Sequence, residues 1–225
     1  MSESVLFTWS GGKDSALALH ELLAGGARVS ALLTTVTAQY GRVSMHGVRE
    51  DLLRRQAASL GIPLETVAIS ADSSNEEYQA RMHEALLRHR RLGTARVAFG
   101  DIFLEDLRRY REENLRRAGM EAVFPIWGRK TPELARRFLA LGFRAVVTCV
   151  DSEALDGSFA GREYDESFLS DLPPGVDPCG ENGEFHSFVY DGPIFSEPVA
   201  VARGEVVVRD GRFHFCDLVP AFQPA

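Results

Sequence analysis

Ser10-Gly11-Gly12-Lys13-Asp14-Ser15 is the stretch that decides the fold of this chain. It follows an apolar run that predicts a strand over 4–9, and it leads into a leucine- and alanine-rich run that predicts a helix over 12–25. A strand, a glycine-rich turn and a helix in this order direct unpaired backbone N–H groups toward an anion. Adjacent glycines allow close approach, Lys13 adds a positive charge and the serines add hydroxyl groups. The stretch therefore predicts a phosphate or pyrophosphate site.

The spacing of this stretch differs from that of the common P-loop, which needs a glycine where this chain has Phe7. The hexapeptide instead resembles the PP-loop of the ATP pyrophosphatases. That resemblance implies that ATP is split between its α and β phosphates, that a substrate oxygen is adenylated, and that a nucleophile then displaces AMP. The alternative is a serine- and glycine-rich turn that only caps a helix.

Composition and charge narrow the classes of protein. The 225 residues include 25 Lys and Arg against 32 Asp and Glu, a net charge of −7, which argues against a broad nucleic-acid-binding surface. No basic segment with a following apolar region begins the chain, and no apolar run approaches the ~20 residues of a membrane span. The three cysteines are widely separated in the sequence and form no C-x-x-C pair. We expect a cytoplasmic protein with no membrane and no nucleic-acid partner.

Strand and helix signals alternate over the first ~150 residues, and this alternation predicts a doubly wound parallel sheet with helices on both faces. The expected strands are 4–9, 28–36, 64–69, 95–99, 120–124 and 143–150, and the expected helices are 12–25, 47–60, 75–91, 103–118 and 131–141.

The composition changes toward the C-terminus, where prolines gather and Asp210-Gly211 predicts the turn of a β-hairpin. We therefore expect an α/β nucleotide-binding domain over 1–127 and a smaller α+β domain, facing the substrate, over 128–225.

Ligands of doubly wound folds bind at the carboxyl ends of the strands, which directs attention to four positions. Thr34 follows the second strand, where a base or ribose would lie, and His46 precedes a helix, where it would meet phosphate or base or be incidental. Gly100 ends the fourth strand and permits close backbone approach. Asp101 follows it, placed to hold a ribose hydroxyl or Mg²⁺, or to cap the next helix.

A second polar stretch, 179–188, contains Glu181, Asn182, Gly183, Glu184 and His186 just before a strand-like run. Two carboxylates this close raise each other's pKa, and they could bind ammonium or act as a general base on it. The alternative is a polar turn that enters a hairpin.

With these pieces placed, the chain resembles the diphthine–ammonia ligase family of PP-loop ATPases. The resemblance is carried by three motifs, Ser10 to Ser15, Gly100-Asp101-Ile102-Phe103-Leu104-Glu105-Asp106-Leu107 and Gly180-Glu181-Asn182-Gly183-Glu184-Phe185. It implies a PP-loop domain, similar to the adenine nucleotide α hydrolases, joined to a smaller domain with the active site between them. It also implies an ATP-dependent amidoligase that adenylates a carboxylate, transfers ammonia to it and releases AMP and pyrophosphate.

The residue roles that follow are expectations. ATP binding is expected at Ser10, Gly11, Gly12, Lys13, Asp14, Ser15, Thr34, His46, Gly100 and Asp101. Catalytic roles are expected for Lys13, Asp14, Glu181 and Glu184, contacts to the acceptor or ammonia for Glu105, Asn182, Gly183 and His186, and Mg²⁺ ligation for Asp14 and Asp101. The expected partners are ATP, Mg²⁺, ammonia, a small-molecule or protein carboxylate, and a second copy in a homodimer.

The motif before the last strands departs from the family pattern. Family members that modify diphthine, a histidine derivative of elongation factor 2, continue E-G-G-E-[YF]-E-T. Here Asn182 replaces a glycine, His186 a carboxylate and Ser187 a threonine, which changes what binds beside the motif. The Ala, Arg, Leu and Gly richness suggests a GC-rich bacterial source, and bacteria are not expected to make diphthamide. The acceptor is therefore left open.

Two other functions remain open from the sequence. One is an RNA-modifying, thiolation-type enzyme, in which Cys179 would carry the sulfur. The other is a non-catalytic adenine-nucleotide-binding module, which has little need of Lys13 or of the residues at 181–186.

Overall fold

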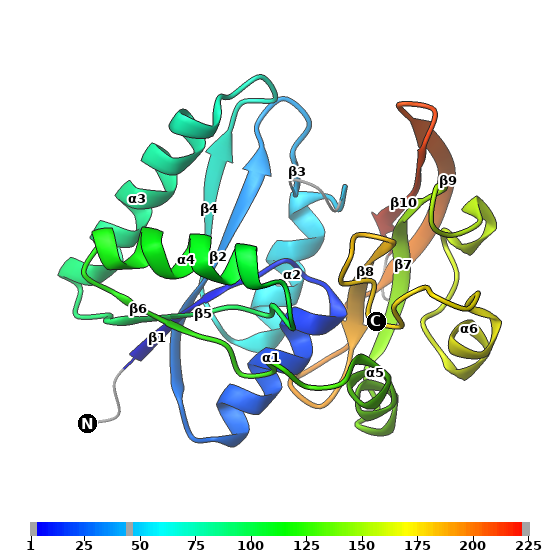
Figure 1. Ribbon diagram of the computed structural model, residues 1–225, viewed down its shortest axis with the longest axis horizontal. Coiled ribbons are helices and arrows are strands. Elements are labelled where there is room, and N and C mark those ends of the chain that lie inside the picture. The colour runs from blue at the N-terminus through cyan, green and yellow to red at the C-terminus, as the bar shows by residue number, and fades with distance from the viewer. Residues whose placement is uncertain (1–3, 44–46, 222–225) are drawn as a thin grey trace.

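The computed structural model describes residues 4–43 and 47–221, which build two β-sheets side by side (Figure 1). The first sheet is six-stranded and has parallel strands in the order β4-β2-β1-β5-β6, with β3 antiparallel to the end of β2. Its strands are β1 (Ser4–Thr8), β2 (Arg28–Thr37), β3 (Arg42–Val43), β4 (Leu64–Ile69), β5 (Arg96–Ala98) and β6 (Glu121–Val123).

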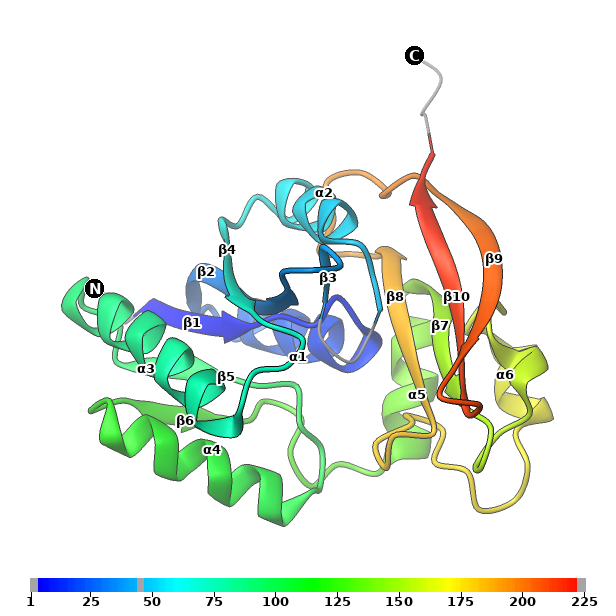
Figure 2. The same ribbon diagram turned by 90° about the horizontal axis from the view of Figure 1, so that it is seen from above.

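Helices cover both faces of this sheet, as Figure 2 shows. Helices α1 (Lys13–Ala24) and α2 (Glu50–Leu60) lie on one face, and α3 (Asn75–Arg91) and α4 (Glu105–Arg117) lie on the other. Successive side chains of a strand point to opposite faces, so Phe7 packs with the α1 and α2 residues while Leu6 packs with those of α3 and α4. Each helix therefore packs its apolar side against one face of the sheet.

The second sheet is antiparallel, in the order β8-β7-β10-β9. Its strands are β7 (Arg144–Asp151), β8 (Phe185–Asp191), β9 (Val201–Arg209) and β10 (Phe213–Pro220), accompanied by α5 (Thr131–Ala140), a 3₁₀ turn (Gly157–Phe159) and α6 (Glu166–Asp171). Three residues connect β9 and β10, and Arg212 N donates to Arg209 O at 3.0 Å across a tight turn. The two central residues of this turn, Asp210 and Gly211, both have positive φ, 53° and 64°.

A buried glutamine joins the two sheets. Gln56 of α2 is fully buried, accepts a hydrogen bond from Trp9 Nε1 at 2.9 Å, and donates to the carbonyl oxygens of Gly11 at 3.0 Å and Val189 at 2.5 Å. One hydrophobic core cluster also runs from α1 and α2 into β7 and β8. The glycine-rich loop after β1 is thus fixed against the second sheet.

The structure confirms the doubly wound parallel sheet and the C-terminal hairpin. The expectation that 143–150 is a sixth strand of the parallel sheet is wrong. This segment forms β7, which lies in the second sheet with antiparallel neighbours on both sides. A strand–helix alternation does not reveal that the chain leaves a sheet after β6 and starts another. The boundary between 1–127 and 128–225 stays a prediction.

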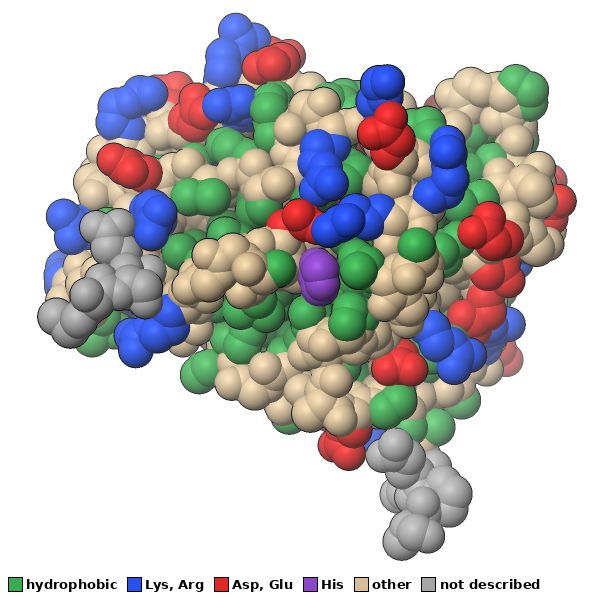
Figure 3. Space-filling view, turned by 90° about the horizontal axis from the view of Figure 1, so that it is seen from below, with side chains coloured by type: hydrophobic (Ala, Val, Ile, Leu, Met, Phe, Trp, Pro, Cys, Tyr) green, Lys and Arg blue, Asp and Glu red, His purple; other side chains and the backbone are tan. Residues whose placement is uncertain are grey.

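The molecular surface has mixed charge on the face shown in Figure 3, where Lys and Arg side chains lie beside Asp and Glu side chains. Among the ion pairs of the described chain are those of Glu21 with Arg137 at 2.7 Å and with Arg129 at 3.3 Å. No helix within residues 4–43 and 47–221 is long and apolar enough to cross a bilayer.

Candidate active site

A cavity of about 310 Å³ opens where the carboxyl ends of β1 and β5 meet. The chain leaves β1 toward α1 on one face and leaves β5 toward α4 on the other, so this is the topological switch point at which doubly wound folds bind ligands. Many of the expected site residues line it, namely Ser10, Gly12, Lys13, Asp14, Ser15, Thr34, Gly100, Asp101, Glu181, Gly183 and His186.

Glycines let the loop fit between its neighbours. Gly11 has φ of 78°, and a Cβ there would lie 2.8 Å from Gln56 Oε1. A Cβ on Gly100 would lie 2.9 Å from the backbone nitrogen of Ser15, so the end of β5 packs directly on the first turn of α1. Only residues without a side chain permit these approaches.

The first turn of α1 carries backbone donors that are free for an anion. The Gly12 N–H donates to Ser10 Oγ at 3.2 Å, and Ser10 Oγ lies 2.7 Å from Ser15 Oγ. The N–H groups of Asp14 and Ser15 have no hydrogen-bond partner in the described parts of the chain. Unpaired donors at a helix N-terminus favour phosphate, as the sequence pattern predicts.

Lys13 projects from this turn toward the second sheet. Its side chain is 4% exposed, and Nζ pairs with Asp14 Oδ2 at 2.9 Å and donates to the Cys179 carbonyl oxygen. The ammonium also lies 4.9 Å from the ring centre of Phe185 and 5.7 Å from that of Tyr164. Burial is the largest effect and favours the neutral amine, but the attractions of Asp14, Cys179 and Glu181 together outweigh it, and the pKa of Lys13 lies above its ordinary value.

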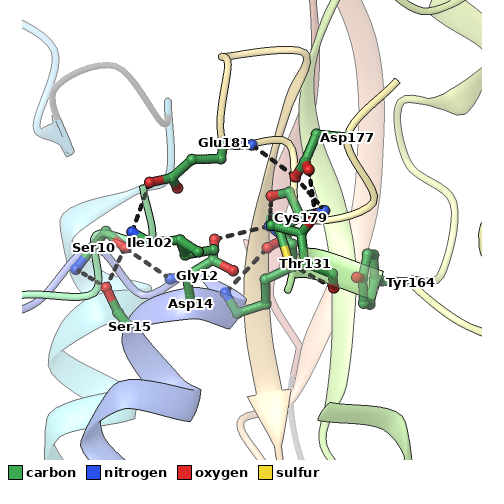
Figure 4. Close-up of polar contacts among 12 residues, drawn as sticks. Ser10, Gly12, Asp14, Ser15, Ile102, Thr131, Tyr164, Asp177, Cys179 and Glu181 are labelled. Atoms are coloured by element: carbon green, nitrogen blue, oxygen red, sulfur yellow. Dashed lines mark hydrogen bonds and ion pairs between the residues drawn. The ribbon is translucent and has the colours of Figure 1, made fainter. Parts of the chain in front are cut away.

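Glu181 reaches the cavity from the opposite side, out of the loop that precedes β8 (Figure 4). Its Oε1 accepts from the backbone N–H of Ile102 at 2.7 Å and of Phe103 at 3.4 Å. Its Oε2 has no hydrogen-bond partner among the residues that the structure describes. Burial, assisted by the negative charge of Asp14, raises the pKa of Glu181 to about 7. The carboxyl therefore changes protonation near neutral pH.

Two other carboxylates hold the loop that carries Glu181. Asp177 Oδ1 accepts from the backbone N–H groups of Cys179 at 2.8 Å and Glu181 at 3.3 Å. Glu184 is buried and accepts from Asp177 N at 3.0 Å, Asn182 N at 3.0 Å and Asn182 Nδ2 at 2.9 Å. The Glu184 side chain is thus bonded within its own loop and does not line the cavity.

Asp101 lies at the cavity edge in a two-point ion pair. Arg111 of α4 donates through Nε to Asp101 Oδ2 at 2.5 Å and through Nη2 to Oδ1 at 3.2 Å, and its guanidinium lies 4.5 Å from the ring centre of Phe99. The alternative that Asp101 caps the next helix is wrong, because α4 begins four residues later, at Glu105, and its N-cap is Leu104.

The remaining expected residues are dispersed. The Thr34 hydroxyl donates to the Trp9 carbonyl oxygen and lines the cavity. Glu105 and Asn182 are exposed and lie outside the cavity lining, as does Gly11. His46 lies outside the described residues.

Sequence reasoning missed several residues of the site. Ser187 accepts from the Lys13 backbone N–H at 3.2 Å, and Gln56 holds the Gly11 carbonyl. A signal for Gln56 was present, because it is a polar residue on the apolar face formed by Leu52, Leu53 and Ala57. Tyr78 and Met82 of α3 also line the cavity, and no local pattern marks them.

Comparison with known protein families identifies two domains in the sequence of this chain. The N-terminal domain of diphthamide synthase matches residues 3–122, and its C-terminal domain matches residues 130–217. The chain belongs to the diphthamide synthase family. Its relatives in this family include the diphthine–ammonia ligase of Homo sapiens, 26% identical over 89% of this chain and 83% of that protein, and that of Danio rerio, 25% identical over 89% and 87%. The Schizosaccharomyces pombe diphthine–ammonia ligase is 25% identical over 90% of this chain and 37% of its own length.

Among solved structures, a predicted subunit of tRNA methyltransferase from Methanocaldococcus jannaschii is similar to this chain with a TM-score of 0.44 and 20% sequence identity. The match covers 64% of this chain and 80% of that subunit. A likeness at that level does not bear on function.

The cavity of this diphthamide synthase family member contains two carboxylates, Asp14 and Asp101, that bear on whether Mg²⁺ could bind there with a nucleotide. Within residues 4–43 and 47–221, no group of three or more His, Cys, Asp or Glu side chains forms a metal site by itself. Asp14 and Asp101 line the cavity as separate carboxylates. Mg²⁺ commonly binds through one or two carboxylates together with substrate phosphates. Asp14 is paired with Lys13 through Oδ2 alone, whereas both oxygens of Asp101 are bonded to Arg111 and would have to be released before Asp101 could hold a metal.

Proposed function

We propose that this protein is an ATP-dependent, AMP-forming ligase that adenylates a carboxylate and transfers ammonia to it. Membership of the diphthamide synthase family supports the proposal, as do the relatives named diphthine–ammonia ligase. The observation that carries it is the meeting of Glu181 with the Lys13-bearing turn in one cavity. One element is suited to a pyrophosphate and the other to a proton transfer.

The turn from Ser10 to Ser15 would hold the phosphates in the first step. Its free N–H groups, its hydroxyls and the Lys13 ammonium would stabilise the negative charge that develops on pyrophosphate as the acceptor carboxylate attacks the α-phosphate. Mg²⁺, held by Asp14 and Asp101 together with the phosphates, would neutralise further charge. Thr34, within β2, and Gly100, just after β5, line the cavity and would contact the nucleotide.

Glu181 would act in the second step. Ammonia attacks the acyl-adenylate carbon, the bond to AMP breaks, and the nitrogen must lose a proton to become an amide. A carboxylate whose pKa is about 7 is a stronger base than an ordinary glutamate and is ionised above neutrality. Its Oε2 would accept the proton while Oε1 stays bonded to Ile102 and Phe103.

Glu184 is proposed to position this base rather than to react. Its three hydrogen bonds fix the loop between Asp177 and Asn182, from which Glu181 projects. The neighbouring His186 and Gly183 line the cavity and would contact the acceptor, whereas the exposed Asn182 and Glu105 would meet only an acceptor that extends beyond the cavity. We propose a small-molecule or protein carboxylate as the acceptor, with diphthine as one candidate.

Sulfur transfer is disfavoured by the state of the Cys179 thiol, although Cys179 is among the residues that line the cavity. Cys179 is buried, its thiol donates to the Thr131 carbonyl oxygen at 3.5 Å, and burial raises the pKa of the thiol. A thiolate is the reactive form of cysteine, and this environment disfavours it.

Product analysis tests the proposal. The protein is incubated with [α-³²P]ATP, Mg²⁺, ammonium and a panel of carboxylic acids that includes diphthine. Ammonium-dependent formation of labelled AMP, with pyrophosphate and an amide in equal amounts, is expected for at least one acid. Labelled ADP with release of phosphate would reject AMP-forming chemistry, and nucleotide binding without turnover on any acid would favour the non-catalytic module.

A further inference from the structure

We propose that β9 is a self-association edge, which pairs antiparallel with β9 of a second copy of this chain about a two-fold axis through Val207. The strand runs along the free side of the second sheet, far from the first sheet in Figures 1 and 2. The proposal is independent of the reaction proposed above.

The outer side of β9 carries the features of an unprotected edge. β9 pairs with β10 on one side and with no strand of the described chain on the other. Val206 and Val208 are 47% and 52% exposed, in a run of three valines. A long edge with exposed β-branched side chains offers unpaired backbone groups to another strand.

Symmetry and charge select one register. A two-fold axis normal to the sheet sets residue i opposite residue j of the second copy, with a constant sum of their numbers. With Val207 on the axis, Glu205 lies opposite Arg209 and Val206 lies opposite Val208. Each of these pairs occurs twice. The register therefore forms a cluster of four valines, Val206 and Val208 of both copies, on one face, and two ion pairs that flank the two Val207 side chains on the other face.

Other registers lack this complementarity. Centring on Glu205 sets that carboxylate against its own copy, and centring on Val206 sets Arg203 against Arg209. Centring on Gly204 sets Arg203 opposite Glu205, but Arg203 already pairs with Glu163 of its own chain, and a glycine then occupies the centre. Glu205 and Arg209 are exposed and have no ion pair among the described residues, which leaves both free for a second copy.

The place of the edge allows two copies to meet. The Val207 register uses the end of the hairpin next to the Asp210-Gly211 turn, while Ala221 bonds to Ala200 at the other end. The cavity between the two sheets is lined by none of the β9 residues. Five residues from each copy overlap, so the contact is smaller than a standard interface and belongs to the weak, reversible class.

Sedimentation velocity on the full chain, from about 1 to about 500 µM, tests the proposal with matched charge variants. The wild-type protein is expected to pass from monomer to dimer as concentration rises. Arg209→Glu and Glu205→Arg each place like charges opposite one another and are expected to weaken the dimer about tenfold or more. The double variant Glu205→Arg with Arg209→Glu restores opposite charges and is expected to recover wild-type association.

Arg203→Glu separates the registers, because Arg203 lies opposite a charged residue in the Gly204-centred and Val206-centred arrangements but not in the Val207-centred one. It is therefore expected to leave the dimer unchanged. A wild-type chain that stays monomeric throughout the range would overturn the proposal. Equal association of all variants, or weakening by Arg203→Glu without weakening by Arg209→Glu, would also overturn it. Thermal unfolding of each variant checks that the monomers remain folded.

Discussion

Glu181 Oε1 lies 2.7 Å from the backbone nitrogen of Ile102, although 79 positions separate the two residues in the chain. Ile102 follows β5 of the parallel sheet, and Glu181 precedes β8 of the antiparallel sheet. The hydrogen bond brings a carboxyl with a raised pKa to the edge of a cavity that the Lys13-bearing turn forms on its other side. The candidate active site is therefore composite, and neither sheet contains it alone.

Replacing Lys13 tests the phosphate-binding role of the turn. Lys13→Ala removes the ammonium that would stabilise developing charge on pyrophosphate, and turnover is expected to fall by at least about 10²-fold. Lys130→Ala is a matched control, since that side chain is 81% exposed and its ion pair among the described residues is a 3.6 Å contact with Glu133. Initial rates of AMP formation check this, and equal rates for both variants would remove Lys13 from the chemistry.

Glu184→Gln tests whether that residue is structural. An amide group replaces one of the two oxygens that accept N–H groups, so a buried donor loses its acceptor. The expected loss of stability is about 1–3 kcal/mol, or ~2–4 °C in Tm for each kcal/mol. Calorimetry measures it against Glu181→Gln, whose amide oxygen can still accept from Ile102 and for which no loss of stability is expected. Wild-type Tm together with abolished activity would point to a catalytic Glu184.

Gly100→Ala tests the close packing of β5 on α1. The added Cβ would meet the Ser15 nitrogen at 2.9 Å and the Asp14 carbonyl carbon at 3.1 Å, neither of which moves without shifting the turn. ATP affinity is expected to fall about tenfold or more. Gly26→Ala is the control, because its φ of 76° strains an alanine but nothing lies within 4 Å of the new Cβ. Calorimetric titration should show a loss of ATP binding only in the first variant.

Cys179→Ala separates amide formation from sulfur transfer. The variant keeps the backbone carbonyl that accepts from Lys13, and the thiol itself is buried and protonated. The rate of ammonium-dependent AMP release is expected to remain within about threefold of wild type, given a folded protein. Loss of activity at an unchanged Tm would revive the cysteine as a reacting group.

The fold could be read from the sequence to the extent that its signals are local. The turn at Ser10 to Ser15, helix 75–91 and the Asp210-Gly211 hairpin are each specified by neighbouring residues, and the structure has all three. The membership of β7 in a second sheet depends on strands that come later in the chain. No pattern within β7 itself distinguishes a parallel from an antiparallel neighbour.

The candidate site was predictable by residue type and less so by orientation. The motif at 180–185 contains two glutamates, Glu181 and Glu184, and the sequence alone predicts a catalytic role for both. The fold directs Glu181 across to Ile102 and turns Glu184 back into its own loop. Likewise Asp101 is marked by its place after a strand, yet its partner Arg111 is set by the packing of α4. Orientation depends on tertiary contacts that spacing does not encode.

Glu181 is the residue on which the ammonia-transfer step depends. Because its pKa is about 7, the carboxylate form that accepts a proton increases as pH rises through neutrality. The same shift bears on stability with the opposite sign, since a carboxyl whose pKa rises on folding stabilises the fold below its ordinary pKa of 4.5 and loses that contribution as pH rises through about 7.

The most direct test is the rate of AMP release between about pH 5.5 and 8.5, with free ammonia held constant, for the wild type and Glu181→Gln. The account predicts that the wild-type rate rises through an apparent pKa near 7, and that Glu181→Gln is slower by about 10²-fold or more and loses this rise. A Glu181→Gln enzyme with the wild-type rate and the wild-type pH profile would contradict it.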